Sequence, residues 1–260
     1  MLKSKRRLII IVSILGVLLL LLILGGALFS LRGVTVEYNY TYGSEHIKNY
    51  NKDEIVRVGN FPFGKNILFQ EYSSCFERIE EAFPYAKVYG TTRHFPNKLI
   101  VCISEREPVV RFQTKTGSWA VLDVELKVLN IASFDNLTEF ERGLPVYEPL
   151  DGETASLGKK LSSEANKSII TSIRQAVGDN DSNLSMAFIE NISVTESAGD
   201  ITVVKIVLDD DGLTIKIFGT NNLAQRALQA FNFYQTHVDH SQDLSNYVIT
   251  VTESGLLSAG

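Results

Sequence analysis

The chain has 260 residues, of which 45% are apolar and 21% charged, a composition typical of a folded protein with one or two domains and not of a disordered one. Its two cysteines exclude a disulfide-dense scaffold and a four-cysteine zinc site. The net charge is −5, and the first seven residues hold four bases and no acid, so the remainder is more acidic still. That remainder lacks the general basic surface that binding to nucleic acid requires.

Residues 8–31 form an apolar run without a charged side chain. A helix of 24 residues reaches about 36 Å, whereas the hydrocarbon core of a bilayer is about 30 Å thick. We therefore expect a single transmembrane helix at residues 8–31, and the preceding bases predict a cytoplasmic tail at residues 1–7. A cleavable signal peptide is the alternative, but its apolar region is only about 7 to 15 residues long and ends at a small-x-small site. The longer run favours a retained anchor.

Apolar residues after this run recur first with a period of two and then with helical spacing. Asn51 lies three residues before Glu54, a capping-box pattern that begins a short helix, and Pro84 ends a second, amphipathic helix. The predicted elements are a strand at residues 34–41, helices at residues 51–58 and 71–83, and strands at residues 86–93 and 99–103.

The second half of the chain predicts a larger, strand-rich region. Prolines and glycines at residues 133–160 indicate a loop, and three aspartates at residues 209–211 followed by Gly212 indicate a hairpin turn. The predicted elements are short strands at residues 109–112, 119–122 and 126–129, a helix at 161–177, strands at 188–194, 201–208 and 213–218, a helix at 222–235 and a final strand at 247–252.

Four motifs occur in order between residues 64 and 109. They read GKNILF at residues 64–69, FPYAKV at residues 83–88, RHFPNKLIV at residues 93–101 and EREPV at residues 105–109. With the basic tail, the apolar run and the strand after it, these motifs resemble the FtsQ/DivIB family of bacterial cell-division proteins. Residues 64–108 resemble the POTRA module of that family, a three-stranded sheet covered by two helices, which agrees with the order predicted from periodicity.

The second half of the chain extends the resemblance. Residues 119–129 resemble a strand pair of the family, with Asp123 in place and Glu125 where glycine is usual. Gly219 before a helix, and the closing strand, resemble the end of the family's β domain. The closing strand departs from the family pattern, because residues 243–247 read DLSNY where an acidic-aliphatic-Arg-Tyr run is frequent.

The predicted fold class is α+β, with a single transmembrane helix, a POTRA-like module of order β-α-α-β-β and a larger β-rich domain with two helices. The expected domains are a cytoplasmic tail at residues 1–7, the transmembrane helix at residues 8–31, the POTRA-like domain at residues 32–106, the β domain at residues 107–252 and a flexible C-terminal tail at residues 253–260.

The resemblance implies a non-catalytic scaffold of the divisome that supports septum formation. The expected partners are FtsB/DivIC-like and FtsL-like membrane proteins, which it would bind outside the cytoplasmic membrane, and a septal peptidoglycan synthase. The expected location is the bacterial cytoplasmic membrane, at the division septum. Neither a cofactor, a metal, a small-molecule substrate nor a catalytic residue is expected.

The resemblance also points to the closing strand as the partner contact. A terminal strand at a sheet edge exposes unpaired N–H and C=O groups, which a partner segment binds by adding a strand. Alternation predicts that Tyr247, Ile249 and Val251 pack inward. The predicted partner-binding residues are Asn246, Tyr247, Val248, Ile249, Thr250, Val251 and Thr252.

Two groups of residues could be drawn as metal sites. His237 and His240 lie near Asp239 and Asp243, but a third committed zinc ligand is missing, which favours a solvated surface. The aspartates at residues 209–211 lack the alternating ligands of a calcium loop. We expect an acidic hairpin at the second group.

The sequence leaves two alternatives for each of two further features. Cys75 and Cys102 either pair or remain free, and buried free thiols are favoured because one pair does not establish a disulfide framework. The charged residues 105–107 form either a surface contact in the hinge between the two modules or a solvated strand end.

Two other classes of function compete with the scaffold. An anchored cell-wall enzyme would need a cluster of catalytic groups, and the sequence carries none of the common nucleophile or phosphate-binding motifs. A POTRA-bearing translocation component would need tandem modules or a following barrel, and the predicted elements show neither.

Overall fold

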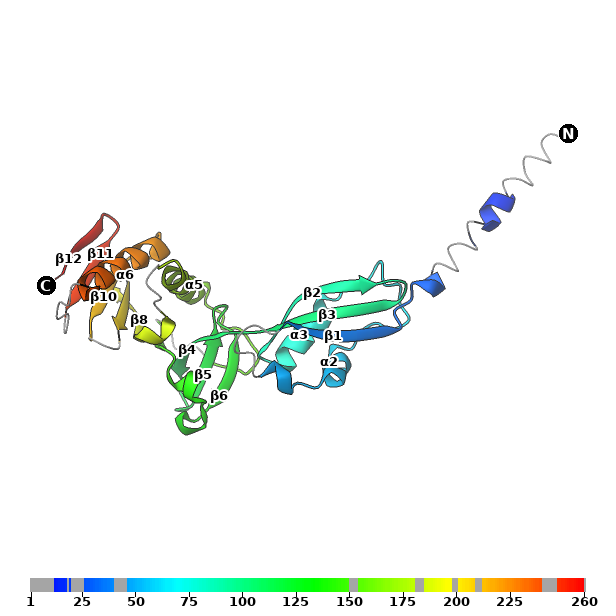
Figure 1. Ribbon diagram of the computed structural model, residues 1–260, viewed down its shortest axis with the longest axis horizontal. Coiled ribbons are helices and arrows are strands. Elements are labelled where there is room, and N and C mark those ends of the chain that lie inside the picture. The colour runs from blue at the N-terminus through cyan, green and yellow to red at the C-terminus, as the bar shows by residue number, and fades with distance from the viewer. Residues whose placement is uncertain are drawn as a thin grey trace, which may run out of the picture. The chain divides into compact units, whose positions relative to one another are not determined.

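The computed structural model is shown in Figure 1. The chain divides into two compact units, Met1–Glu105 (unit 1) and Arg106–Gly260 (unit 2). The described residues are 12–17, 19, 26–39, 46–149, 154–180, 185–197, 201–208, 212–239 and 247–259.

The structure contradicts the predicted transmembrane helix, because no helix among the described residues is both long and apolar enough to cross a bilayer. Residues 8–11, 18 and 20–25 of the apolar run lie outside the described residues, as does the predicted cytoplasmic tail at residues 1–7. The α+β class is the part of the fold prediction that the structure supports.

Unit 1 is a three-stranded sheet of order β1-β3-β2, with two helices on one face (Figure 1). Strand β1 is parallel to β3, and β2 is antiparallel to β3. The observed order of strand, helix, helix, strand and strand is the order that periodicity predicts. The elements are β1 (Gly33–Asn39), η1 (Ile47–Asn49), α2 (Lys52–Gly59), α3 (Ser73–Ala82), β2 (Ala86–His94) and β3 (Lys98–Glu105).

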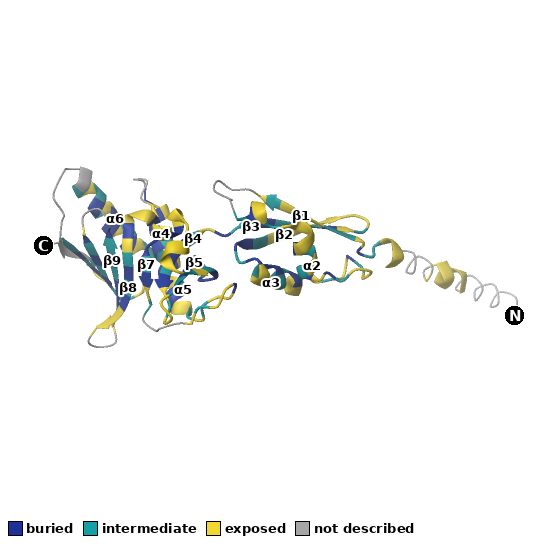
Figure 2. Ribbon diagram, turned by 90° about the horizontal axis from the view of Figure 1, so that it is seen from below, coloured by how far each residue is buried: buried dark blue, intermediate teal, exposed yellow. Residues whose placement is uncertain are grey.

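The core of unit 1 lies between the helices and the sheet. Ile55 of α2 and Ile79 of α3 pack with three alternate residues of β3, Leu99, Val101 and Ile103, and all five are fully buried. Figure 2 marks buried positions in dark blue. The alternation along β3 places every second side chain on the face that the two helices cover.

Unit 2 is a nine-stranded sheet of order β12-β11-β10-β9-β8-β7-β4-β5-β6. Buried residues of α5 and α6 join those of the strands in one core. The strands are β4 (Pro108–Gln113), β5 (Trp119–Asp123), β6 (Val128–Ala132), β7 (Val146–Glu148), β8 (Ile189–Ser197), β9 (Ile201–Leu208), β10 (Thr214–Phe218), β11 (Val248–Thr252) and β12 (Gly255–Ala259). The helices are η2 (Phe134–Asn136), α4 (Glu139–Arg142), α5 (Glu164–Gly178), η3 (Met186–Phe188) and α6 (Leu223–Asp239).

The stretch predicted as a loop, residues 133–160, contains the helix α4 and the strand β7. Thr138 and Glu141 form a capping box at the start of α4, and buried Glu141 also accepts a hydrogen bond from Asn130 Nδ2 at 3.0 Å. Strand β7 is parallel to both of its neighbours, β4 and β8. The β domain therefore has a third α-helix beyond the two predicted, because the capping box makes one short turn of helix stable.

The predicted C-terminal tail at residues 253–260 is also corrected. Residues Gly255–Ala259 form β12, which pairs antiparallel with β11 after a turn at Glu253 and Ser254. The Thr252 hydroxyl lies 2.8 Å from the Ser254 hydroxyl and 3.3 Å from the Gly255 carbonyl oxygen, within hydrogen-bond distance of both. In this short hairpin the backbone N–H and C=O groups of the two strands form hydrogen bonds with each other instead of with water.

Arg106, the first residue of unit 2, forms a buried ion pair with Asp123 at 2.6 Å and is therefore not part of a solvated strand end. The other carboxylate oxygen of Asp123 accepts hydrogen bonds from the backbone N–H groups of Glu125 and Lys127. Leu126 takes the positive φ of this turn, at 56°, and is fully buried. Asp123 thus holds both the β5–β6 turn and the start of unit 2.

We predict that Asp123→Ala lowers the free energy of unfolding of unit 2 by about 3–5 kcal/mol, because it removes one partner of a buried ion pair together with two hydrogen bonds. Urea denaturation followed by the fluorescence of Trp119 measures this change. The control is Lys167→Ala, which breaks an exposed pair with Glu164 on α5 of the same unit and should cost less than about 1 kcal/mol. Equal costs for the two variants would contradict the prediction.

Candidate partner-binding edge

The residues predicted to bind partners form β11, with Tyr247 before it, and Asn246 lies outside the described residues. Ile249 and Val251 are fully buried in the core of unit 2, as alternation predicts. Tyr247 packs against the same core and is half-buried. The side chains of this segment therefore mainly stabilise the sheet.

Strand β11 is not the edge of the sheet. It pairs parallel with β10 on one side and antiparallel with β12 on the other, so its backbone groups are engaged on both sides. The prediction that β11 offers unpaired backbone to a partner is wrong on this point. The edge strand is β12, and within the described part of the chain no other strand pairs with its outer side.

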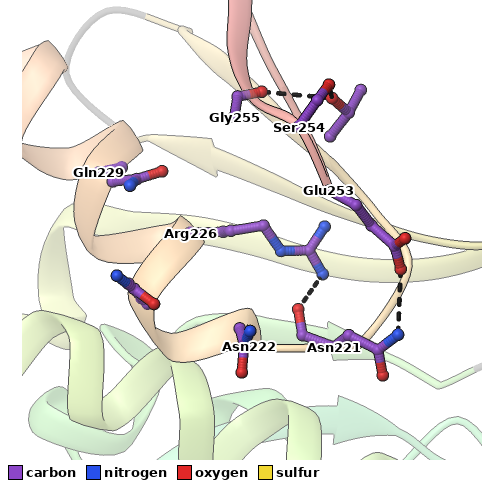
Figure 3. Close-up of a pocket in the computed structure, with 9 residues that line it drawn as sticks. Asn221, Asn222, Arg226, Gln229, Glu253, Ser254 and Gly255 are labelled. Carbon is purple, nitrogen blue, oxygen red and sulfur yellow. Dashed lines mark hydrogen bonds between the residues drawn. The ribbon is translucent and has the colours of Figure 1, made fainter.

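The turn between β11 and β12 is bonded to the segment that leads into α6. Glu253 Oε1 accepts a hydrogen bond of 3.0 Å from Asn221 Nδ2 (Figure 3). Gly219, in the same segment, has a φ of 81°, and a Cβ built on it would lie 3.4 Å from Glu253 Oε1. The absence of a side chain at Gly219 thus allows both the turn and the close approach of Glu253.

Arg226 of α6 fixes this segment from the inside. Its side chain is buried and donates hydrogen bonds to the backbone carbonyl oxygens of Phe218, Gly219 and Asn221. Burial lowers the pKa of the Arg226 guanidinium, and the carboxylate of Glu253 acts in the opposite direction. Because an arginine keeps its charge in proteins, these carbonyl groups receive charge-assisted hydrogen bonds.

These residues border a polar pocket of about 510 Å³ beside the β11–β12 turn. Arg226 and Gln229 reach the pocket from α6, and Glu253, Ser254 and Gly255 border it from the turn (Figure 3). The lining residues are Asn221, Asn222, Gln225, Arg226, Gln229, Thr252, Glu253, Ser254 and Gly255. Amide, hydroxyl and charged groups of this kind can donate and accept hydrogen bonds.

The other candidate residues are placed elsewhere. His237 Nδ1 lies 2.8 Å from the Phe233 carbonyl oxygen on α6, whereas His240 and Asp243 lie outside the described residues. Among the described residues, no group of three or more histidine, cysteine or acidic side chains could hold a metal ion. Cys75 and Cys102 are free thiols, the first of them buried.

Sequence reasoning missed the two features that define this edge. A polar turn followed by Gly255 is the signal that could have revealed the β11–β12 hairpin, since glycine readily takes the φ of 116° found there. The role of Arg226 has no comparable signal, because its three acceptors are backbone groups that any sequence carries.

Comparison with known proteins does not identify a family. The sequence matches no protein-family model, and no curated protein matches it.

We predict that Gly219→Ala destabilises unit 2 by about 1–2 kcal/mol, because alanine is strained at a φ of 81°. Urea denaturation measures the loss, and hydrogen exchange should show faster opening of the β11–β12 hairpin. Gly143→Ala, in the same unit, is the control, since Gly143 has a φ of −81° and the nearest atom lies 3.6 Å from the added Cβ, an ordinary contact distance. An equal loss in both variants would refute the role given to Gly219.

Proposed function

We propose that this protein is a non-catalytic scaffold of the bacterial cell-division machinery that binds FtsB/DivIC-like and FtsL-like partners outside the cytoplasmic membrane. The observation that carries the proposal is that β12 lies at one end of a nine-stranded sheet and that no other described strand pairs with its outer side. The strand-helix-helix-strand-strand order of unit 1 and the motifs between residues 64 and 109, which resemble the FtsQ/DivIB family, support the same function.

The composition of β12 suits strand addition. Natural edge strands commonly carry lysine, proline or inward charges that block pairing with another chain. Residues 255–259 read GLLSA and contain none of these. A partner strand that pairs with β12 gains backbone hydrogen bonds, each with a net contribution of about 1 kcal/mol.

The opposite edge of the sheet is better protected. Val128, the first residue of β6, exchanges backbone hydrogen bonds with Gly158 and Lys159. Just before it, the Leu126 carbonyl oxygen accepts a hydrogen bond from Leu161 N–H, and Lys127 forms a bridge with Lys160. This segment covers part of the β6 edge. Of the two ends of the sheet, β12 is therefore the one that offers its backbone to a partner.

We predict that truncation after Ser254 weakens binding to the extracytoplasmic segment of the DivIC-like partner about tenfold or more, because the edge strand and its hydrogen bonds are lost. Isothermal titration measures the affinity, and circular dichroism verifies folding. Ile131→Lys, on β6 at the opposite edge, is the control and should bind normally.

A second variant keeps the experiment decisive if the truncated chain unfolds. Leu257→Lys keeps every backbone N–H and C=O group of the hairpin and introduces a lysine, which natural edge strands use against pairing with another chain. Thr250→Pro is unsuitable, because it breaks a ladder inside the sheet. Normal binding by a folded Leu257→Lys variant would contradict docking at β12.

We predict that a fluorescent fusion of the full chain gathers in a band at mid-cell before constriction in its source bacterium. Time-lapse microscopy through the cell cycle measures this distribution. A uniform signal throughout the cycle would contradict the role in division. Because this test uses the unaltered chain and measures no binding affinity, it separates the cellular role from the docking mode.

A further inference from the structure

One end of unit 1 is built from three segments that are joined by backbone hydrogen bonds. Residues 29–33 bond to residues 64–67: Leu31 N–H donates to the Lys65 carbonyl oxygen at 2.8 Å, and Ile67 N–H donates to the Phe29 carbonyl oxygen at 2.8 Å. The same stretch bonds to the β2–β3 turn, where Arg32 N–H donates to the Asn97 carbonyl oxygen at 2.8 Å. These bonds hold the three loops in one place.

Large apolar side chains stand exposed on these loops. Phe69 is 81% exposed and Phe95 57% exposed, and the Phe95 ring contacts the Phe29 ring edge-on, with centroids 6.0 Å apart. We call the following exposed set the apolar end: Leu28, Phe63, Leu68, Phe69 and Phe95. Single exposed apolar residues are common, but five on neighbouring loops of one small unit mark an interaction surface.

The charges on the same loops are all of one sign. Arg32, Lys65, Arg93 and Lys98 are exposed, and residues 28–33, 61–69 and 93–98 contain no acidic residue. Arg93 also anchors the group, because its Nε donates to the Ile67 carbonyl oxygen at 3.0 Å. This local basicity contrasts with the net charge of −5 for the whole chain.

We propose that the apolar end is a docking surface for an anionic phospholipid bilayer. Aromatic side chains favour the interface between headgroups and acyl chains, and nearby lysine and arginine are attracted to anionic headgroups. A bilayer surface meets both requirements at once. Val12, Ile14 and Leu15, earlier in the chain, are apolar and exposed as well.

The test uses the full chain and a probe at single positions. Trp119→Phe removes the only tryptophan, and Phe69→Trp or Phe95→Trp then places one at the apolar end. Phe140→Trp, at a 62% exposed position on α4 of unit 2, is the matched control. Each variant is mixed with vesicles of equal parts phosphatidylcholine and phosphatidylglycerol, with brominated acyl chains as the quencher.

We expect bromine to quench the tryptophans at positions 69 and 95 at least about twofold more than the one at position 140, because only the former reach the acyl chains. Lys65→Gln and Lys98→Gln should each raise the lipid concentration needed for half-maximal quenching about fivefold. Equal quenching at positions 69 and 140 would overturn the proposal. Equal quenching by vesicles of phosphatidylcholine alone would also overturn it, because anionic headgroups would then not be needed. So would protection of the tryptophan at position 69 from solvent by the DivIC-like segment in the absence of vesicles, because the surface would then bind a protein.

Discussion

Strand β7 is the element on which unit 2 depends, because it pairs with β4 on one side and with β8 on the other and so makes one sheet from two groups of strands. It has three residues, so its own backbone bonds are few. Its central residue, Tyr147, is buried and donates a 2.7 Å hydrogen bond to Asn166 Oδ1 of α5, which is also buried. Helix α5 thereby holds β7 in place, and the order of the whole sheet follows.

A continuous sheet of this kind has two ends, and the chain treats them differently. Residues 158–161 cover part of β6, whereas β12 has no second neighbour among the described strands. A scaffold that binds by strand addition needs one open edge and gains by closing the other, because two open edges would allow copies of the sheet to pair end to end. The difference between the two edges is the structural basis of the proposed function.

Two buried arginines of unit 2 fix loops in different ways. Arg106 pairs with the carboxylate of Asp123, so its charge is neutralised by a side chain. Arg226 instead donates to three backbone carbonyl oxygens, with Glu253 as the nearby acid. Both use the fixed fork of guanidinium donors, which lets one side chain satisfy several acceptors in a turn. The second arginine positions the segment to which the β11–β12 turn is bonded.

Periodicity and turn residues suffice for the elements of unit 1 and for the long helices of unit 2, because these patterns depend on neighbours a few positions apart in the chain. Short elements were missed or misjudged: β7 and α4 were predicted as a loop, and β12 as a flexible tail. In the candidate site, the inward side chains among residues 247–252 can be predicted from alternation. The position of this strand inside the sheet, next to β12, cannot. The sequence by itself determined which faces are apolar. Only the tertiary structure decided which strand lies outermost, because strand pairing joins backbone groups that are alike in every residue and is chosen by packing between distant segments.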